Sequence, residues 1–267
     1  MSIKKHRAAI DKIDAKIVYL LNRRTKHVLG IGKDKLAAGK APYQPDREQA
    51  LLRRIRKLNG GPISDESLGH IYREVMSSSI ALQKTFTIAF LGPEATYTHQ
   101  AAVRRFGTSL GYAPQKTIAE VFAEVEKNRA EYGVVPVENT TEGVVTHTLD
   151  MFVDSPLKIV AQIIMPIEHC LIGRGALKDV KKLYSHPQAY AQCRNWVRET
   201  MPRVEFIGSS STTAAAELAA KSKTAAAISS SLAAEKYQLN ILEAGVQDHS
   251  GNATRFLVLG SECAAPS

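Results

Sequence analysis

The first third of the chain has the pattern of apolar positions expected of helices and no convincing strand pattern. Turn-forming residues at Gly39, Pro42 and Gly60-Gly61 interrupt this pattern, and Ser64 is a favourable N-cap residue. We therefore predict three helices, approximately over residues 3–35, 46–59 and 65–84.

The remaining two thirds alternate between short apolar runs and amphipathic stretches. Predicted strands cover residues 86–92, 132–139, 203–208, 225–229 and 254–260, each beside a polar or Ser/Thr-rich loop. Thr117 and Glu120 have the spacing of a capping box, which predicts a helix beginning there. The alternation predicts an α/β fold with a largely parallel sheet. The predicted organisation is therefore an all-α three-helix domain over residues 1–84 and an α/β domain over residues 85–267.

The positive charge of the chain is concentrated in the helical part. Residues 1–84 hold 18 Lys and Arg against 8 Asp and Glu, whereas the rest holds 17 basic and 18 acidic residues. No apolar run approaches the ~20 residues that a membrane-spanning helix needs, and the N-terminus lacks the features of a signal peptide. Three widely spaced cysteines fit neither a disulfide framework nor a zinc pattern. We expect a cytoplasmic protein that does not bind membranes.

The first predicted helix has an apolar seam that a cation interrupts. Ile3, Ile10, Ile17, Arg24 and Ile31 follow one another at intervals of seven, a spacing typical of helices that pair with a partner. A buried guanidinium needs an anionic or polar partner. That partner is either an internal Glu, a register-setting polar layer or an anionic ligand. The seam position argues against a nucleic-acid binder, because DNA-binding cations usually lie on an exposed face.

Several cations and amides of this region resemble those of the all-helical chorismate mutase family. The matching residues, in order and close spacing, are Arg7, Arg24, Lys35, Gln44, Arg47, Glu48, Ser79 and Gln83. The resemblance implies an intertwined homodimer, formed through the N-terminal helices, in which each active site borrows one arginine from the other chain. Further pairing of dimers into tetramers is left open.

The resemblance also implies roles for individual side chains. Arg7 of the partner, Arg24 and Arg47 would hold the two carboxylates of chorismate. Gln44 stands where some members of the family carry Asp, so this polar contact is altered. Arg7 lies about 42 Å from Lys35 along a straight helix, which is too far for both to serve one pocket within a chain.

The remaining mutase side chains suit a rearrangement without a nucleophile. By resemblance, Lys35 and Gln83 would hydrogen-bond the ether oxygen of chorismate, and Glu48 the ring hydroxyl. Conversion of chorismate to prephenate is unimolecular, so holding the substrate in a chair and stabilising charge on the ether oxygen is sufficient. The resemblance therefore implies no metal and no cofactor.

Four polar clusters mark the ends of strands or the starts of helices in the α/β part. They cover residues 92–99, 136–143, 185–189 and 209–213, and the segment Asn252-Ala253-Thr254-Arg255-Phe256 follows them. Hydroxyls and amides at helix N-termini can bind anions. A single cluster of this kind is more often an ordinary N-cap, but together the clusters indicate a site for a small carboxylate.

This set resembles the prephenate dehydratase family over about residues 86–260, above all in Thr254-Arg255-Phe256. The resemblance implies two α/β lobes around a cleft, as in periplasmic binding proteins. Thr254 would give a hydrogen bond or a proton to the departing hydroxyl, while Arg255 would position the substrate and Phe256 would pack the site. The implied prephenate-binding residues are Thr96, Glu138, Asn139, Thr140, Ser185, Gln188, Ser211, Thr212, Arg255 and Phe256. Glu138 and His186 are rival acids.

The two resemblances together imply a bifunctional enzyme of phenylalanine biosynthesis. The alternatives are that one activity is retained, with the dehydratase favoured, or that the cleft binds a carboxylate without catalysis. His99, His147, His169, His249 and Cys193 are interpreted as structural or exposed. The sequence ends at Ser267, shortly after the last strand, so we expect no phenylalanine-binding regulatory domain and weak or no binding of phenylalanine.

Overall fold

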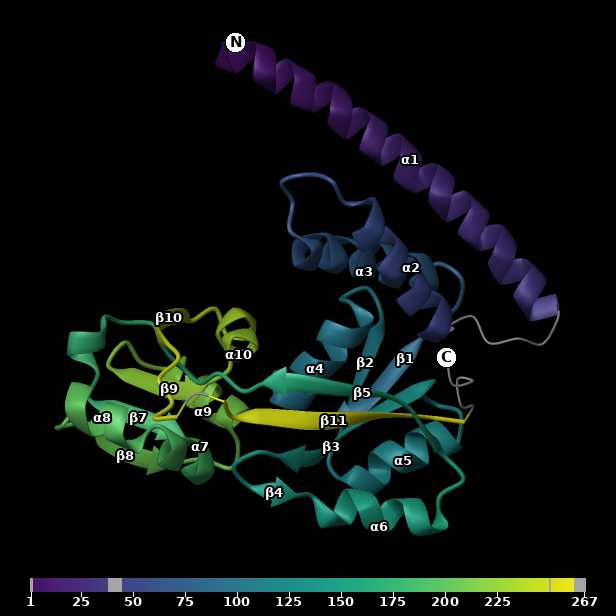
Figure 1. Cartoon of the computed structure of the whole chain (residues 1–267). Coiled ribbons are helices and arrows are strands. Elements are labelled where there is room, and N and C mark those ends of the chain that lie inside the picture. The colour runs from purple at the N-terminus through teal and green to yellow at the C-terminus, as the bar shows by residue number, and fades with distance from the viewer. Residues whose placement is uncertain (1, 38–44, 250, 262–267) are drawn as a thin grey trace. The chain divides into compact units, whose positions relative to one another are not determined.

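A computed structural model of the chain describes residues 2–37, 45–249 and 251–261. The described chain forms two compact units, whose elements are labelled in Figure 1. The first unit holds the residues up to Phe86 together with Phe106–Gly111, and the second holds Thr87–Arg105 and the residues from Tyr112 onward. No helix in the described ranges is both long enough and apolar enough to cross a membrane.

Three helices make up most of the first unit, as predicted. They are α1 (Ile3–Ala37), α2 (Pro45–Leu58) and α3 (Asp65–Ala81). Ser64 is the N-cap of α3, and its hydroxyl accepts a hydrogen bond from the backbone N–H of Ser67 at 3.1 Å. The predicted N-cap is therefore confirmed.

The apolar seam of α1 lies at the surface of the described chain. Ile3, Ile10, Ile13 and Ile17 are between 48% and 73% exposed. Further along the helix, Arg24 is half-buried and its guanidinium Nη1 donates a hydrogen bond to Ser79 Oγ of α3 at 3.2 Å. A run of exposed isoleucines of this length marks a surface that another chain could cover.

A segment from the α/β part of the sequence is bound to α3 within the first unit. The Glu74 carboxylate accepts hydrogen bonds from the backbone N–H and the hydroxyl of Thr108, at 3.1 Å and 2.8 Å. Ser77 Oγ accepts a hydrogen bond from the backbone N–H of Ser109 at 3.2 Å. Gly107 has a φ of +83°, and a Cβ built there would lie 2.5 Å from the Ser77 Cβ. A glycine is required at this contact because a side chain would be strained and would clash.

The second unit contains two sheets, and most of its helices flank them (Figure 1). The six-stranded sheet has the order β2-β1-β3-β11-β5, with β4 beside β3, and its strands are β1 (Thr87–Leu91), β2 (Gly111–Gln115), β3 (Tyr132–Asn139), β4 (Gly143–Val144), β5 (Lys158–Pro166) and β11 (Ala253–Gly260). The five-stranded sheet has the order β10-β6-β9-β7-β8, and its strands are β6 (Cys170–Gly173), β7 (Lys182–Ser185), β8 (Glu205–Gly208), β9 (Ala225–Ser229) and β10 (Asn240–Ala244). The helices between strands are α4 (Tyr97–Phe106), α5 (Ile118–Glu126), α6 (Thr146–Asp154), the 3₁₀ turn η1 (Leu177–Asp179), α7 (Pro187–Gln192), α8 (Arg194–Thr200), α9 (Thr212–Ala219) and α10 (Ser231–Lys236). The prediction of an α/β fold is confirmed.

The prediction of a largely parallel sheet is wrong. β1 and β3 are parallel, and so are β7 with β8 and β7 with β9, but β11 and β6 run antiparallel to both of their neighbours. The chain passes from the first sheet to the second between β5 and β6 and returns between β10 and β11. The composition of short buried apolar runs does not reveal strand direction, because direction depends on how the strands are connected.

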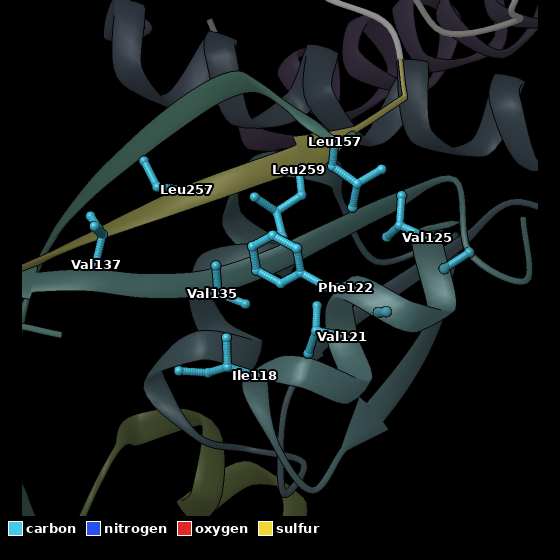
Figure 2. Close-up of a cluster of buried hydrophobic side chains, with 11 residues drawn as sticks. Ile118, Val121, Phe122, Val125, Val135, Val137, Leu157, Leu257 and Leu259 are labelled. Atoms are coloured by element: carbon cyan, nitrogen blue, oxygen red, sulfur yellow. The ribbon is translucent and has the colours of Figure 1, made fainter. Parts of the chain in front are cut away.

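The helix predicted to begin at Thr117 is α5, which packs on the first sheet. Thr117 Oγ1 accepts a hydrogen bond from the backbone N–H of Glu120 at 3.1 Å, which begins α5. Val121, Phe122 and Val125 on one face of α5 pack against β3 and β11 (Figure 2). Full burial of such side chains stabilises the fold by roughly 1.5–3 kcal/mol each. This packing holds β3 and β11 beside each other. The polar residues at the ends of both strands form part of a pocket.

Candidate active sites

A cavity of about 530 Å³ in the second unit is lined by residues from both sheets and from the helices beside them. The first sheet and its loops contribute Thr96, Asn139 and Thr254, while the second contributes Gln188, Ser211 and Thr212. All six were predicted to bind or act on prephenate. None of the described residues that line the cavity is Lys or Arg. An anionic ligand there would be held by hydroxyls, amides and backbone N–H groups.

Thr254 and Asn139 face each other across adjacent strands. Their Cα atoms are paired in the register of β11 with β3, and the amide Nδ2 of Asn139 donates a hydrogen bond to Thr254 Oγ1 at 2.7 Å. Asn139 Oδ1 accepts hydrogen bonds from the backbone N–H groups of Thr141 and Glu142, at 2.9 Å and 3.1 Å. Because an amide oxygen cannot donate, these contacts fix the amide with its NH₂ group toward Thr254. The Thr254 oxygen is thus an acceptor here, and its own proton is free to be donated.

Ser211 and Thr212 lie at the start of α9. Ser211 is the N-cap, and its Oγ accepts a hydrogen bond from the backbone N–H of Ala214 at 3.0 Å. The N-cap interpretation is therefore correct for Ser211, yet the residue also lines the cavity. The N–H groups of a helix's first turn carry partial positive charge, which suits a carboxylate.

A chain of hydrogen bonds runs along one wall of the cavity. The Tyr97 hydroxyl and His169 Nδ1 are 2.8 Å apart, and His169 Nε2 is 2.8 Å from Gln192 Oε1. Asn252 Nδ2 donates to the same Gln192 oxygen at 2.9 Å, and Asn139 Nδ2 donates to Asn252 Oδ1 at 2.8 Å. These side chains connect the base of the cavity to Thr254.

Burial sets the protonation states along this chain. Desolvation lowers the pKa of His169 below its ordinary value, while a hydrogen bond with Gln192 acts in the opposite direction more weakly. The ring of Tyr97 is partly exposed, but desolvation of its hydroxyl raises the pKa well above the ordinary phenol value. Burial also raises the pKa of Cys193 to about 12, so this thiol is unreactive at neutral pH. At neutral pH, His169 is therefore uncharged and Tyr97 is protonated.

Four residues predicted to bind prephenate do not line the cavity, namely Glu138, Thr140, Ser185 and Arg255. Arg255 and Glu138 are paired in register one position beyond Thr254 and Asn139, and Arg255 Nε lies 3.6 Å from Glu138 Oε2. Successive strand residues point to opposite faces, so this ion pair lies on the other face of the sheet.

The other two of these residues support the backbone beside the cavity. Thr140 Oγ1 accepts a hydrogen bond from the backbone N–H of Ala253 at 3.0 Å and pins the loop before β11. Ser185 is fully buried, and its hydroxyl donates to the backbone carbonyl of His186 at 3.1 Å. Phe256 is buried and lines the cavity, as predicted for a packing residue.

Sequence reasoning missed several polar residues of the cavity wall. Gln192 shares a helix face with Gln188 at i and i+4, and Asn252 precedes Thr254 by two positions, so both spacings contained a usable signal. His169 was interpreted as structural or exposed; it is buried, and it also lines the cavity. Its partner Tyr97 is 72 residues away in sequence, and no local pattern joins the two.

The mutase residues that can be placed lie in the first unit. Arg24 contacts Ser79, and Gln83 Nε2 donates to the backbone carbonyl of Ser79 at 3.2 Å. Glu48 is buried in the first unit, whereas Arg47 is exposed. Gln44 and the Lys35 side chain lie outside the described residues.

Arg7 is exposed near the start of α1, 28 positions before Lys35 on one continuous helix. At 1.5 Å per residue, the two backbone positions are about 42 Å apart. Arg24, which contacts Ser79, lies 17 positions after Arg7, about 26 Å along the same helix. A single chain therefore does not bring Arg7 to the residues around Ser79.

The chain has a helical unit followed by a two-lobed α/β unit, whose cavity is lined by hydroxyls and amides. This combination defines a class of two-domain enzymes that act on small carboxylates. The prephenate dehydratase profile matches residues 88–264, and the chorismate mutase type II profile matches residues 6–84. The bifunctional chorismate mutase/prephenate dehydratase of Aquifex aeolicus is 46% identical over 99% of this chain and 75% of its own length. The chain therefore belongs to the bifunctional chorismate mutase/prephenate dehydratase family.

Two solved structures resemble the α/β unit. A prephenate dehydratase from Arthrobacter aurescens in complex with L-Phe is 32% identical, with a TM-score of 0.62 over 68% of this chain and 62% of that chain. GqqA, described as a quorum quenching acylase, is 31% identical, with a TM-score of 0.61 over 68% of this chain and 66% of that chain. Both likenesses agree with the two-lobed fold.

Proposed function

We propose that the chain catalyses two successive reactions. The helical unit rearranges chorismate to prephenate, and the α/β unit converts prephenate to phenylpyruvate, CO₂ and water. The proposal is supported by the two matching family profiles and by the 46% identical bifunctional relative. The free, buried Cys170 and Cys193 are in keeping with a reducing compartment, and we propose a cytoplasmic location.

The observation that carries the dehydratase mechanism is the polarity of the hydrogen bond between Asn139 and Thr254. Asn139 is the donor at 2.7 Å, so the Thr254 hydroxyl proton points away from it and is available to a ligand. A threonine hydroxyl is a weak acid, and on pKa alone it is a poor general acid at neutral pH. The reaction needs little help from an acid, because loss of the hydroxyl group and CO₂ produces an aromatic ring and is therefore strongly favourable.

The dehydratase reaction breaks two bonds of the prephenate ring. The bond from the ring to its carboxylate breaks and releases CO₂, and the electron pair of that bond enters the ring. The bond from the opposite ring carbon to its hydroxyl then breaks, and the hydroxide takes up one proton and leaves as water. Thr254 donates the hydrogen bond or proton to that oxygen and recovers its proton from solvent.

The side-chain carboxylate of prephenate requires a site opposite Thr254. We assign it to Ser211, Thr212 and the first backbone N–H groups of α9, because no Lys or Arg is among the described lining residues. Gln188 on α7 lies in the same wall and can donate to the adjacent keto oxygen. Thr96 and Phe256 close the cavity on the side of the first sheet.

For the mutase, we propose that Arg24, Arg47 and Arg7 of a partner bind the two carboxylates of chorismate. Lys35 and Gln83 hydrogen-bond the ether oxygen, and Glu48, Ser79 and Gln44 complete the pocket. Support comes from the Arg24–Ser79 hydrogen bond and from the position of Gln83 next to Ser79 on α3. The exposed isoleucines of α1 support a homodimer through this helix, since pairing would bury them.

One incubation tests the proposal. Purified protein receives chorismate, and prephenate and phenylpyruvate are followed separately. Thr254→Val, which keeps the side-chain shape, should lower dehydratase kcat by roughly 10²–10³-fold and leave the mutase unchanged. Thr254→Ser keeps the hydroxyl and is the matched control, while Arg24→Ala should abolish only the mutase. Full dehydratase turnover by Thr254→Val would refute the role of Thr254, and accumulation of prephenate by the wild type would show that the mutase alone survives.

A further inference from the structure

His169 lies on one of the two connections between the sheets of the second unit. It follows β5 of the six-stranded sheet and immediately precedes β6 of the five-stranded sheet. The backbone N–H of His169 donates to Gln247 Oε1 at 2.9 Å, and its carbonyl accepts from the backbone N–H of Val246 at 2.9 Å. Gln247 and Val246 belong to the returning connection, so His169 is held between both crossings.

The side chain of His169 joins one residue from each lobe. Tyr97 begins α4, which follows β1 of the first sheet, and Gln192 ends α7, which follows β7 of the second. The imidazole contacts both at 2.8 Å, through Nδ1 and Nε2 respectively. The residue itself is 3% exposed. A buried imidazole with both nitrogens engaged has a fixed orientation.

The hydrogen bonds of Gln192 determine which ring nitrogen of His169 carries the proton. Gln192 Nε2 donates to Glu142 Oε1 at 3.2 Å, and Gln192 Oε1 accepts from Asn252 Nδ2 at 2.9 Å. The atom facing His169 is therefore an amide oxygen, which accepts only, so His169 Nε2 must be the donor. The Tyr97 hydroxyl lies 2.8 Å from His169 Nδ1 and donates at 3.0 Å to the backbone carbonyl of Glu168, which only accepts. In the uncharged ring Nδ1 also accepts, so these two acceptors compete for the one hydroxyl proton of Tyr97.

The same network ends at Thr254. Asn252 is held by Gln192, and its Oδ1 accepts from Asn139 Nδ2 at 2.8 Å. Asn139 Nδ2 also donates to Thr254 Oγ1 at 2.7 Å. Every amide between His169 and Thr254 thus has its oxygen and nitrogen assigned by its neighbours. Loss of the donor at His169 Nε2 would remove one of the three hydrogen bonds that orient the Gln192 side chain.

We propose that uncharged His169 is a positioning residue of the dehydratase site, which acts through Gln192 and Asn252 to keep Asn139 and the Thr254 hydroxyl oriented. The Tyr97 hydroxyl, which also contacts the Glu168 carbonyl, holds the other ring nitrogen of His169 in place. This inference rests on the proposed dehydratase function. It adds that the catalytic hydroxyl is held by a network originating at the connection between the two lobes.

The test uses the full chain and compares three variants in prephenate turnover. His169→Gln can still present an N–H to Gln192 and should retain kcat to within about fivefold, a difference of about 1 kcal/mol. His169→Leu fills a similar volume but has no hydrogen-bond donor. It should lower kcat on the order of 100-fold, because a small misplacement of a reacting group costs about that factor in rate. The change in KM should be smaller. Tyr97→Phe removes only the hydroxyl and should reduce kcat by about tenfold.

A double-mutant cycle separates positioning from general damage to the fold. If His169 acts through Gln192, the pair His169→Leu and Gln192→Ala should be no slower than Gln192→Ala alone. Fluorescence of Trp196 in α8, the one tryptophan of the chain, reports whether the α/β unit of each preparation is folded. Additive losses in the cycle, or full activity of His169→Leu, would overturn the proposal. Failure of the wild type to convert prephenate would instead refute the proposed function.

Discussion

Gly30 and Gly32 of α1 form a matched pair for testing the mutase site. A Cβ built at Gly32 would lie 2.5 Å from Gln83 Oε1, 2.9 Å from its Cδ and 3.0 Å from its Cγ, whereas a Cβ at Gly30 meets no atom within 4 Å. Both residues lie within the same continuous helix. Gly30 is also outside the heptad row of Ile3, Ile10, Ile17, Arg24 and Ile31, so an added methyl there should not disturb a partner helix.

The expected effects on stability follow from this difference. Replacing a helical Gly by Ala stabilises a helix by about 1 kcal/mol, and this gain applies at both positions. At Gly32 the Gln83 side chain must also move. It loses the hydrogen bond to the Ser79 carbonyl, worth about 1 kcal/mol, and takes up a less favourable rotamer at about 0.5–1.5 kcal/mol. Gly30→Ala should therefore stabilise the helical unit, while Gly32→Ala should be neutral or slightly destabilising.

The effects on activity should differ far more than those on stability. Loss of one donor to a developing oxyanion costs about 10²–10³-fold in kcat, so Gly32→Ala should lower mutase turnover on that order. Gly30→Ala should retain wild-type mutase activity, and both variants should retain dehydratase activity. The assay follows the disappearance of chorismate, with urea unfolding monitored by helical circular dichroism. Wild-type mutase turnover by Gly32→Ala would refute either the ether-oxygen role of Gln83 or the need for space beside it.

Two further predictions concern stability. Gly107→Ala places a methyl group 2.5 Å from a serine Cβ of α3 at a φ of +83°, and it should destabilise the protein by about 2–4 kcal/mol in urea unfolding. Gly143 has a similar φ of +84°, but a Cβ built there meets no atom within 4 Å. Gly143→Ala should therefore cost only the backbone strain of a positive φ, about 1–2 kcal/mol of stability. Burial lowers the pKa of both His99 and His169, so the unfolded chain binds more protons. Stability should therefore be full above about pH 6.5 and decrease as the pH falls below that value, by at most about 1.4 kcal/mol per pH unit for each imidazole. A flat profile between pH 7.5 and 5.5 would contradict this.

Local sequence patterns were sufficient to predict features that depend on near neighbours. The three helices of the first unit, the N-cap at Ser64 and the capping residue Thr117 are all set by side chains within a few positions of the element they begin. The candidate residues of the cavity, Thr254 and Asn139, could be proposed because the short motifs that contain them resemble those of the prephenate dehydratase family, although their neighbours Arg255 and Glu138 do not line the cavity.

Other features depended on how distant segments meet. Strand direction in the two sheets is set by how the strands are connected across the whole unit, and the same apolar run can pair with a parallel or an antiparallel neighbour. The register of β11 with β3 pairs Thr254 with Asn139 and Arg255 with Glu138, and a shift of β11 by one residue would turn Arg255 toward the cavity in place of Thr254.

The link between Tyr97 and His169 spans 72 residues, and nothing near either residue indicates the other. Local propensity and motif spacing thus determined which side chains are available to the site. Tertiary packing decided which of them face one another, because contacts between distant residues depend on the register and the crossings of the whole sheet.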